Sequence, residues 1–287
     1  MTSVDKIIAF QGMPGAHSDM ACRAVFPTME TLPCRAFEDA FGAVNEGRAR
    51  LAMIPIDNSV AGRVADIHHL LPKSGLHIVG EHFQRIDQCL LGVKGASMAD
   101  LTHVHSHVHA LGQCRNLIGK MGIEPIVHAD TAGAAAMIAE DGDVTQGAIS
   151  SELAADIYGL DVLKSNIEDA EHNTTRFLIM QKDIVMPEQN GETVVTSFIF
   201  RVRNVPAALY KALGGFATNG INMTKLESYL VDGSFQAAQF YAEVEGHPES
   251  AGMKHAFEEL DFVTHEVKIM GVYPAHPFRI EDAKGAE

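Results

Sequence analysis

The chain of 287 residues is long enough for about two domains with hydrophobic cores. Its residues are 46% hydrophobic and 21% charged, a composition that excludes a disordered tail and a fibre. The 22 Lys and Arg residues against 37 Asp and Glu residues give a net charge of −15 with neutral histidines. A chain so acidic, with no strong basic patch, disfavours a nucleic-acid partner.

The cysteines and the N-terminal segment indicate the compartment. The four cysteines form no CxxC pair, which is typical of reduced thiols and not of a secreted disulfide framework. Residues 1–10 are too short and too acidic for a signal peptide, and no apolar run reaches the length of a membrane span. We therefore expect a cytoplasmic protein with no membrane partner.

Short apolar runs alternate with Ala-rich helical stretches as far as residue 183, a pattern that predicts an α/β architecture. The expected strands are 6–10, 49–56, 148–149 and 177–181, two extended pieces lie within 77–91, and the expected helices are 19–26, 37–46, 111–121 and 131–140. A linker without periodicity follows at 184–192.

The remainder predicts a second domain over 193–275 and a C-terminal tail over 276–287. Its elements follow the order β-α-β-β-α-β, with Asp232-Gly233 as the hairpin turn, and this order is the ferredoxin-like pattern. The expected elements are strands at 193–203, 221–230, 235–244 and 262–270 and helices at 205–216 and 248–260.

Two polar turns follow predicted strands. The glycine-bearing turn Gly12–Ser18 opens a helix, and its free N–H groups are suited to an anion; a tight strand-to-helix turn is the alternative. Asp57, Asn58 and Ser59 stand at the carboxyl end of the next strand, where α/β proteins gather ligand sites, although they also suit a helix N-cap.

Alternating histidines stand at positions 103, 105, 107 and 109, so an extended chain would place all four imidazoles on one side. A metal-binding protein is one reading of this pattern. No nearby cysteine or carboxylate pair completes a ligand set, and Ala110-Leu111 indicates that a helix begins here, so we expect no metal.

Arg176 lies in the segment Asn173–Phe177, at the start of an apolar strand. A guanidinium binds a carboxylate through two parallel hydrogen bonds, which makes Arg176 a candidate carboxylate ligand. The alternative is a surface arginine beside a polar turn.

These segments together resemble the prephenate dehydratase family. That family carries Gly-x-x-Gly-Ala-x-Ser, Pro-Ile-Glu-Asn-Ser-x-x-Gly, Ser-His-Pro-x-Ala-Leu-x-Gln-Cys and Asn-x-Thr-Arg-Phe motifs, and this chain has related segments in the same order across 9–181. The segment 193–275 resembles the family's regulatory ACT domain. The resemblance thus covers nearly the whole chain.

The resemblance implies a catalytic region over 1–183 made of two lobes, like a type II periplasmic binding protein. Lobe one spans about 1–80 and 165–183, and lobe two spans about 81–164. It also implies conversion of prephenate to phenylpyruvate with loss of CO₂ and water, without a cofactor. The implied catalytic residue is Thr175, and the implied substrate-binding residues are Asn58, Ser59, Ser106, Gln113, Arg176 and Phe177.

The resemblance further implies L-phenylalanine as a feedback inhibitor and a homodimer or homotetramer. The implied phenylalanine-binding residues are Ala208, Leu209, Asn222, Glu227 and Ser228. This chain departs from the family motifs, with Asp57 for Glu, Val108 for Pro and Ala207 for Gly. An ACT domain kept only for assembly is therefore the alternative.

Two other functions remain open. Arogenate dehydratase performs the same elimination on the transaminated side chain and gives phenylalanine directly. A solute-binding or amino-acid-sensing protein would use a two-lobed cleft without chemistry.

Overall fold

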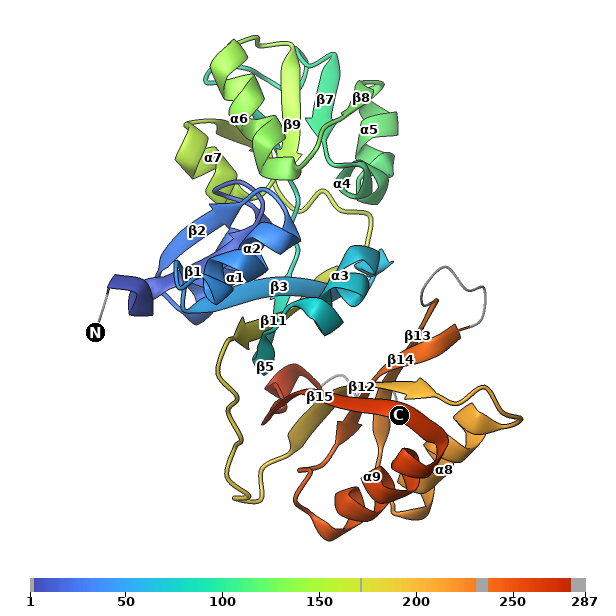
Figure 1. Ribbon diagram of the computed structural model, residues 1–287. Coiled ribbons are helices and arrows are strands. Elements are labelled where there is room, and N and C mark those ends of the chain that lie inside the picture. Colours follow the sequence, from blue (N-terminus) through green and yellow to red (C-terminus); the bar gives the residue numbers. More distant parts are fainter. Residues whose placement is uncertain (1–2, 171, 231–236, 280–287) are drawn as a thin grey trace. The chain divides into compact units, whose positions relative to one another are not determined.

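The computed structural model describes residues 3–170, 172–230 and 237–279 (Figure 1). The chain divides into two compact units, one of residues 1–64 and 82–177 and the other of residues 65–81 and 178–287. Strands β5 and β11 contribute residues to both units.

The first lobe of the first unit is built on a sheet with the strand order β5-β11-β3-β1-β2 (Figure 1). Strand β1 pairs in parallel with β2 and β3, and β3 turns back through the short antiparallel strand β4. The apolar run Leu51–Ile54 of β3 is fully buried, as is typical of a parallel strand covered on both faces. The elements are η1 Ser3–Lys6, β1 Ile7–Gln11, α1 His17–Val25, β2 Glu30–Cys34, α2 Phe37–Asn45, β3 Leu51–Asn58, β4 Gly62–Arg63, β5 His77–Arg85 and β11 Thr174–Gln181.

The second lobe has its own sheet with the order β10-β6-β9-β7-β8. Strands β9, β7 and β8 run parallel, whereas β6 is antiparallel to β9 and β10. An apolar core that includes Val104, Cys114 and Ile149 fills the lobe. The elements are β6 Cys89–Gly92, β7 His103–Ser106, α4 Val108–Gln113, α5 Arg115–Met121, β8 Glu124–Val127, α6 Thr131–Asp141, β9 Gln146–Ser150, α7 Glu152–Tyr158 and β10 Asp161–Lys164.

The second unit contains the ferredoxin-like domain, with the sheet order β13-β14-β12-β15 and two helices (Figure 1). Four phenylalanines lie in its apolar core, with Phe198 stacked on Phe216 at 5.5 Å between ring centroids and Phe200 stacked on Phe240 at 5.2 Å. The elements are β12 Val194–Val202, α8 Ala208–Thr218, β13 Met223–Leu230, β14 Ala237–Glu245, α9 Ala251–Val263 and β15 Thr264–Pro274.

The predicted α/β and ferredoxin-like classes are confirmed, and each predicted strand and helix is present within a few residues. The expected helix 111–121 is interrupted, because Cys114 leaves helical geometry (φ −121°, ψ 25°) between α4 and α5. Asp169 occupies this break: its N–H donates to the Gln113 carbonyl at 2.6 Å, and its carboxylate accepts from the Asn116 N–H at 3.2 Å. The predicted turn at Asp232-Gly233 lies outside the described residues.

Residues 65–81 group with the ferredoxin-like domain, whereas the sequence places them with lobe one. The segment holds α3 Ala65–Leu70, η2 Leu71–Lys73 and the start of β5. Strand β15 pairs in parallel with β5 at Gly271 and Ile78. A Cβ atom at Gly271 would stand 2.1 Å from the Ile78 carbonyl oxygen, so only glycine permits this approach.

Buried polar contacts hold the segment to the domain. His68 of α3 is 2% exposed and pairs through Nδ1 with the Tyr229 hydroxyl. The fully buried Glu81 carboxylate receives two hydrogen bonds from Arg279, at 2.6 and 2.9 Å, and Arg279 also reaches Glu243 at 2.8 Å. Arg279, expected in a tail, is therefore part of a buried Glu–Arg–Glu triad.

No helix among the described residues is long and apolar enough to cross a membrane.

Candidate functional site

The turn after β3 brings Asn58 to Thr175, although the two residues are 117 positions apart. The side-chain oxygen Oδ1 of Asn58 accepts the N–H groups of Val60 (3.0 Å) and Ala61 (2.7 Å), an Asx turn that fixes the side-chain amide. The amide nitrogen then donates to the Thr175 hydroxyl oxygen at 2.9 Å and to Asn173 Oδ1 at 2.8 Å.

Ser59 ties this turn to the start of β11. Its hydroxyl donates to the His172 carbonyl at 2.6 Å and accepts the Thr174 N–H at 2.9 Å, while its own N–H donates to the Thr174 carbonyl at 2.9 Å. Because the hydroxyl proton is already donated, the structure shows Ser59 holding the backbone of the site.

The second lobe contributes Gln113 from the end of α4. Its side-chain oxygen accepts from the Asn173 amide at 3.0 Å and from the Gln88 amide at 3.4 Å. Asn173 is 1% exposed and Gln88 is 2% exposed. A chain of amides therefore runs from Gln88 through Gln113, Asn173 and Asn58 to Thr175.

Arg176 is 7% exposed, so the alternative of a surface arginine is wrong. Its Nη1 lies 3.6 Å from Oδ2 of Asp57, and its guanidinium stands 5.9 Å from the centroid of the Phe83 ring. The pair joins β11 to the end of β3. The Asp57 that replaces the family glutamate therefore faces Arg176.

Two predicted site residues have fully buried side chains. Ser106 is 0% exposed and donates to the Ile149 carbonyl at 2.6 Å, so its hydroxyl links β7 to β9. Phe177 is 1% exposed and is one of the largest side chains of the core. No hydrogen bond among the described residues links the Ser106 or Phe177 side chain to Asn58 or Thr175.

The Gly12–Ser18 turn does not present the expected anion site at its glycines. The N–H of Gly12 donates to the Cys34 carbonyl and that of Gly15 to the Asp19 carboxylate, both at 2.9 Å. Helix α7 packs on the turn so closely that a Cβ atom at Gly15 would stand 2.8 Å from Ala154 Cα. Gly15, with φ +87°, thus permits contact between the two lobes.

His17 in the same turn has both ring nitrogens buried, with no hydrogen-bond partner among the described residues. Burial lowers the pKa of His17 to about 4, although the Asp87 carboxylate opposes the shift. The imidazole is therefore neutral at pH 7.

The alternating histidines are dispersed by the turn from β7 into α4. His105 pairs with Gln146 at 2.7 Å, and His107 caps α4 by accepting the His109 N–H at 3.3 Å. Within the described ranges, no group of three or more His, Cys, Asp or Glu side chains is arranged to hold a metal ion.

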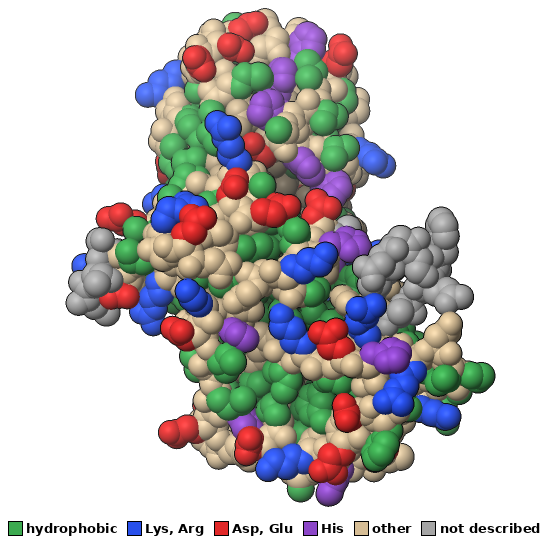
Figure 2. All heavy atoms as spheres, viewed as in Figure 1, with side chains coloured by type: hydrophobic (Ala, Val, Ile, Leu, Met, Phe, Trp, Pro, Cys, Tyr) green, Lys and Arg blue, Asp and Glu red, His purple; other side chains and the backbone are tan. Residues whose placement is uncertain are grey.

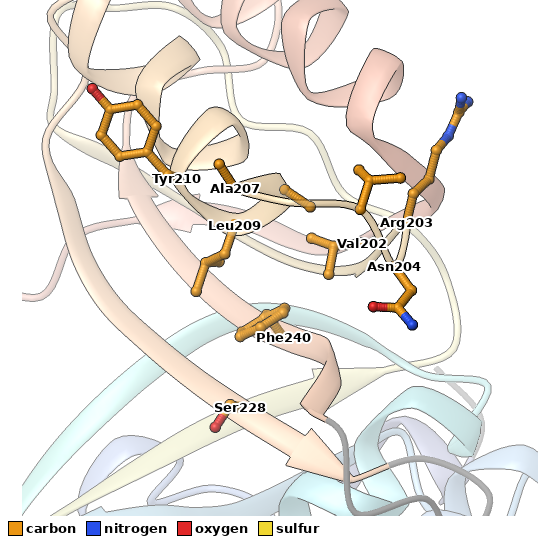
Figure 3. A pocket seen from close by; sticks show the side chains of 10 residues that line it. Val202, Arg203, Asn204, Ala207, Leu209, Tyr210, Ser228 and Phe240 are labelled. Carbon is orange, nitrogen blue, oxygen red and sulfur yellow. The ribbon is translucent and has the colours of Figure 1, made fainter.

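A second site lies in the ferredoxin-like domain, where a pocket of about 490 Å³ opens beside the start of α8 (Figure 3). Its lining includes three of the five residues expected to bind phenylalanine, Ala208, Leu209 and Ser228. The other two, Asn222 and Glu227, do not line this pocket. The Asn222 side chain donates a hydrogen bond to Glu245 at 2.9 Å, and Glu227 forms an ion pair with Lys225 at 3.6 Å.

Ala207, which replaces the family glycine, caps α8 in the left-handed region with φ 61° and ψ 20°. An alanine pays about 1 kcal/mol for this conformation, which glycine adopts freely. The pocket rim therefore carries local backbone strain.

The fold and the first site define the class of protein: a two-lobed α/β protein with a ferredoxin-like domain, in which amides from both lobes and one threonine gather at a single site. A model of the prephenate dehydratase family matches residues 8–184, more than half of the chain. The chain belongs to the prephenate dehydratase family, a family of lyases.

Individual relatives extend over nearly the whole chain. A bifunctional N-acyl-homoserine lactone acylase/prephenate dehydratase of Komagataeibacter europaeus is 52% identical over 275 residues, which cover 96% of this chain and 98% of that protein. Arogenate dehydratase/prephenate dehydratase 1 of Arabidopsis thaliana is 39% identical over 281 residues, 93% of this chain and 71% of that protein. The structure of a prephenate dehydratase from Arthrobacter aurescens in complex with L-Phe is similar, with a TM-score of 0.84, 26% identity and coverage of 98% of this chain and 97% of that chain.

Gln88 and Asn173 are the polar residues of the site that the sequence did not single out as ligands. Asn173 is the first residue of the Asn-x-Thr-Arg-Phe motif, so the motif offers a signal for it. Gln88 lies between two extended pieces, in no motif, and the sequence offers no signal for it.

Proposed function

We propose that this chain converts prephenate to phenylpyruvate, CO₂ and water, with Thr175 as the catalytic residue. The observation that supports the proposal is the hydrogen bond from the Asn58 amide to the Thr175 oxygen. Because that oxygen already accepts a hydrogen bond, the threonine proton is left to donate to another group. In this proposal the acceptor is the ring hydroxyl of prephenate.

The reaction balances without a cofactor. The bond between the ring and its carboxylate breaks and CO₂ leaves, while the electron pair enters the ring and completes the aromatic system. The bond to the ring hydroxyl breaks with its electron pair, and the departing hydroxide takes one proton to become water. Thr175 stabilises the departing oxygen by a hydrogen bond, and the proton comes ultimately from water.

The amides and Arg176 supply the remaining recognition. With its oxygen held by Asn173 and Gln88, the Gln113 amide has no protein acceptor for its nitrogen among the described residues, and so it can donate to a substrate carboxylate. Arg176 contributes positive charge and, through Asp57, holds the end of β3. In a chain of net charge −15, this local arrangement is what a dianion requires.

The test is to supply the purified chain with prephenate and, separately, with arogenate, and to follow phenylpyruvate and phenylalanine. Phenylpyruvate from prephenate is expected. Phenylalanine from arogenate at higher kcat/KM would favour arogenate dehydratase, an activity that the Arabidopsis relative's name also carries. A folded chain that forms neither product would favour a solute-binding or amino-acid-sensing protein.

The 52% identity to the bifunctional relative supports hydrolysis of N-acyl-homoserine lactones as a second candidate activity. The assay supplies an N-acyl-homoserine lactone and follows the free fatty acid and homoserine lactone. Absence of both products, with dehydratase turnover intact, would reject this activity alone.

We also propose that the ferredoxin-like domain is an ACT domain that binds L-phenylalanine as a feedback inhibitor. Support comes from the pocket that contains Ala208, Leu209 and Ser228 and from the L-Phe complex of the Arthrobacter relative. Addition of L-phenylalanine is expected to slow turnover and raise the melting temperature. If it changes neither, the domain serves assembly only.

A cytoplasmic location remains part of this proposal. Its support is that Cys22, Cys34, Cys89 and Cys114 are all free and buried, as expected of a chain in a reducing compartment.

A further inference from the structure

We infer that Asn173 is a positioning residue that aims the side-chain amides of Asn58 and Gln113 toward the substrate. The inference rests on the proposed dehydratase activity. It adds a role for a residue that lies outside the expected set of substrate ligands.

Asn173 uses both ends of its side chain. Its oxygen accepts from the Asn58 amide at 2.8 Å, and its nitrogen donates to the Gln113 oxygen at 3.0 Å. The residue is 1% exposed, so these bonds are shielded from competition with water. A single side chain therefore links one amide from each lobe.

The donation to Gln113 fixes which end of that amide is available. With its oxygen held, Gln113 presents its N–H groups, the donors that an anionic substrate requires. Without Asn173, the weaker contact from Gln88 at 3.4 Å would alone oppose rotation of the amide by half a turn. The rotated amide would present an oxygen to a substrate carboxylate, and the contact would become repulsive.

Asn173 also lies where the chain passes between the lobes. The backbone carbonyl of Asn173 accepts the Ile86 N–H at 2.9 Å. Nearby, the Ile167 N–H donates to the Gln88 backbone carbonyl at 3.0 Å. Residues 86–88 belong to one connection between the lobes, and Ile167 and Asn173 belong to the other, so the two connections lie side by side at these hydrogen bonds. The residue that aligns the two amides is therefore anchored at the lobe junction.

The substitution Asn173→Asp tests the role of the donor. An ionised aspartate can still accept from Asn58 but cannot donate to Gln113. A protonated aspartic acid can do both, and it has nearly the same shape as asparagine. The variant should therefore lose activity at neutral pH and regain it as the pH falls.

The experiment measures kcat and KM for prephenate from pH 8 to pH 5 in the wild type, Asn173→Asp and Asn173→Ala. At pH 8 we expect both variants to lose about 10- to 100-fold in kcat/KM. Relative to the wild type, Asn173→Asp should recover as the pH falls, and Asn173→Ala should not. Asn190→Asp is the matched control, because Asn190 is exposed and its oxygen accepts from the Glu192 N–H, which an aspartate retains.

The outcomes separate the inference from the proposed function. If the wild type forms no phenylpyruvate, the proposed function fails and this inference fails with it. If the wild type turns over and both variants match it, or if Asn173→Asp shows no recovery relative to Asn173→Ala, the inference alone is overturned. Should Asn173→Asp not fold, the double variant of Asn173→Ala and Gln113→Ala decides: losses smaller than the product of the single losses support the coupling, and independent losses overturn it.

Discussion

At the scale of single residues, Thr175 is defined by what its oxygen already accepts. The Asn58 amide nitrogen donates to the Thr175 hydroxyl oxygen at 2.9 Å and so occupies one of its lone pairs. This bond orients the hydroxyl, whose proton then points toward another acceptor. A serine can reproduce this donor, whereas a valine of similar shape cannot.

We therefore expect Thr175→Ser to keep kcat within about tenfold and Thr175→Val to lose about 100-fold or more, the range of a positioned proton or hydrogen-bond donor. The measurement is the rate of phenylpyruvate formation at saturating prephenate, with the melting temperature as a check on the fold. A valine variant with unchanged kcat would remove Thr175 from the reaction.

Ala207 offers a second prediction at this scale. Its left-handed backbone strains an alanine but not a glycine, so Ala207→Gly is expected to increase the free energy of unfolding by up to about 1 kcal/mol. Urea unfolding measures the change. Ala208→Gly, in the helix itself, is the control and should destabilise. A loss of stability in Ala207→Gly would contradict the strain.

His17 makes stability depend on pH. Its pKa of about 4 lies below the usual 6.5, so the unfolded chain binds a proton between these values while the folded chain does not. Stability must therefore fall as the pH falls through this window, by about 2 kcal/mol between pH 7 and pH 5. In His17→Phe this part of the pH dependence should disappear from urea unfolding curves, and an unchanged dependence would exclude His17 as its source.

At the scale of elements, the segment from α3 to β5 depends on a buried cation. Arg279 neutralises the carboxylates of Glu81 and Glu243, both 0% exposed. Arg279→Met should therefore cost about 3–5 kcal/mol of unfolding free energy, because it removes the cation that lies between two buried carboxylates.

An exposed ion pair provides the comparison. Arg48 and Glu46 approach to 2.8 Å, but both side chains are more than half exposed, so Arg48→Met should cost far less than Arg279→Met. Equal losses in the two variants, measured by urea unfolding, would contradict the importance of burial.

Elements of regular period could be predicted from the sequence, and contacts between distant segments could not. Strand β12 alternates clearly, and its boundaries were within one residue of those expected. Strand β2 was missed because Glu30–Cys34 contains Pro33 and no alternation. The break at Cys114 depends on Asp169, which is 55 positions away.

The candidate site shows the same limit. The residue types at Asn58, Gln113 and Thr175 follow from the family motifs. The orientation of each amide depends on Asn173 and Gln88, and such pairings leave no periodic trace in the sequence.

At the scale of the whole molecule, the visible faces of the units carry acidic and basic side chains interspersed with one another (Figure 2). The assembly is still a prediction: we expect a homodimer or homotetramer formed through the ferredoxin-like domains. Light scattering should therefore give two or four times the chain mass of 31.0 kDa. A single-chain mass at assay concentrations would reject the prediction.

The contact between Gly271 and Ile78 has a consequence for how the chain can be divided. A fragment ending near residue 184 would contain the whole family match, yet it would lack β15 and leave one edge of β5 unpaired. Unpaired edges recruit strands from other molecules, so such a fragment would be prone to aggregate. The segment that carries the family's motifs is therefore smaller than the segment that folds as a unit. A gene fusion that joined residues 1–184 to another protein would carry over the site residues without β15, which packs against β5.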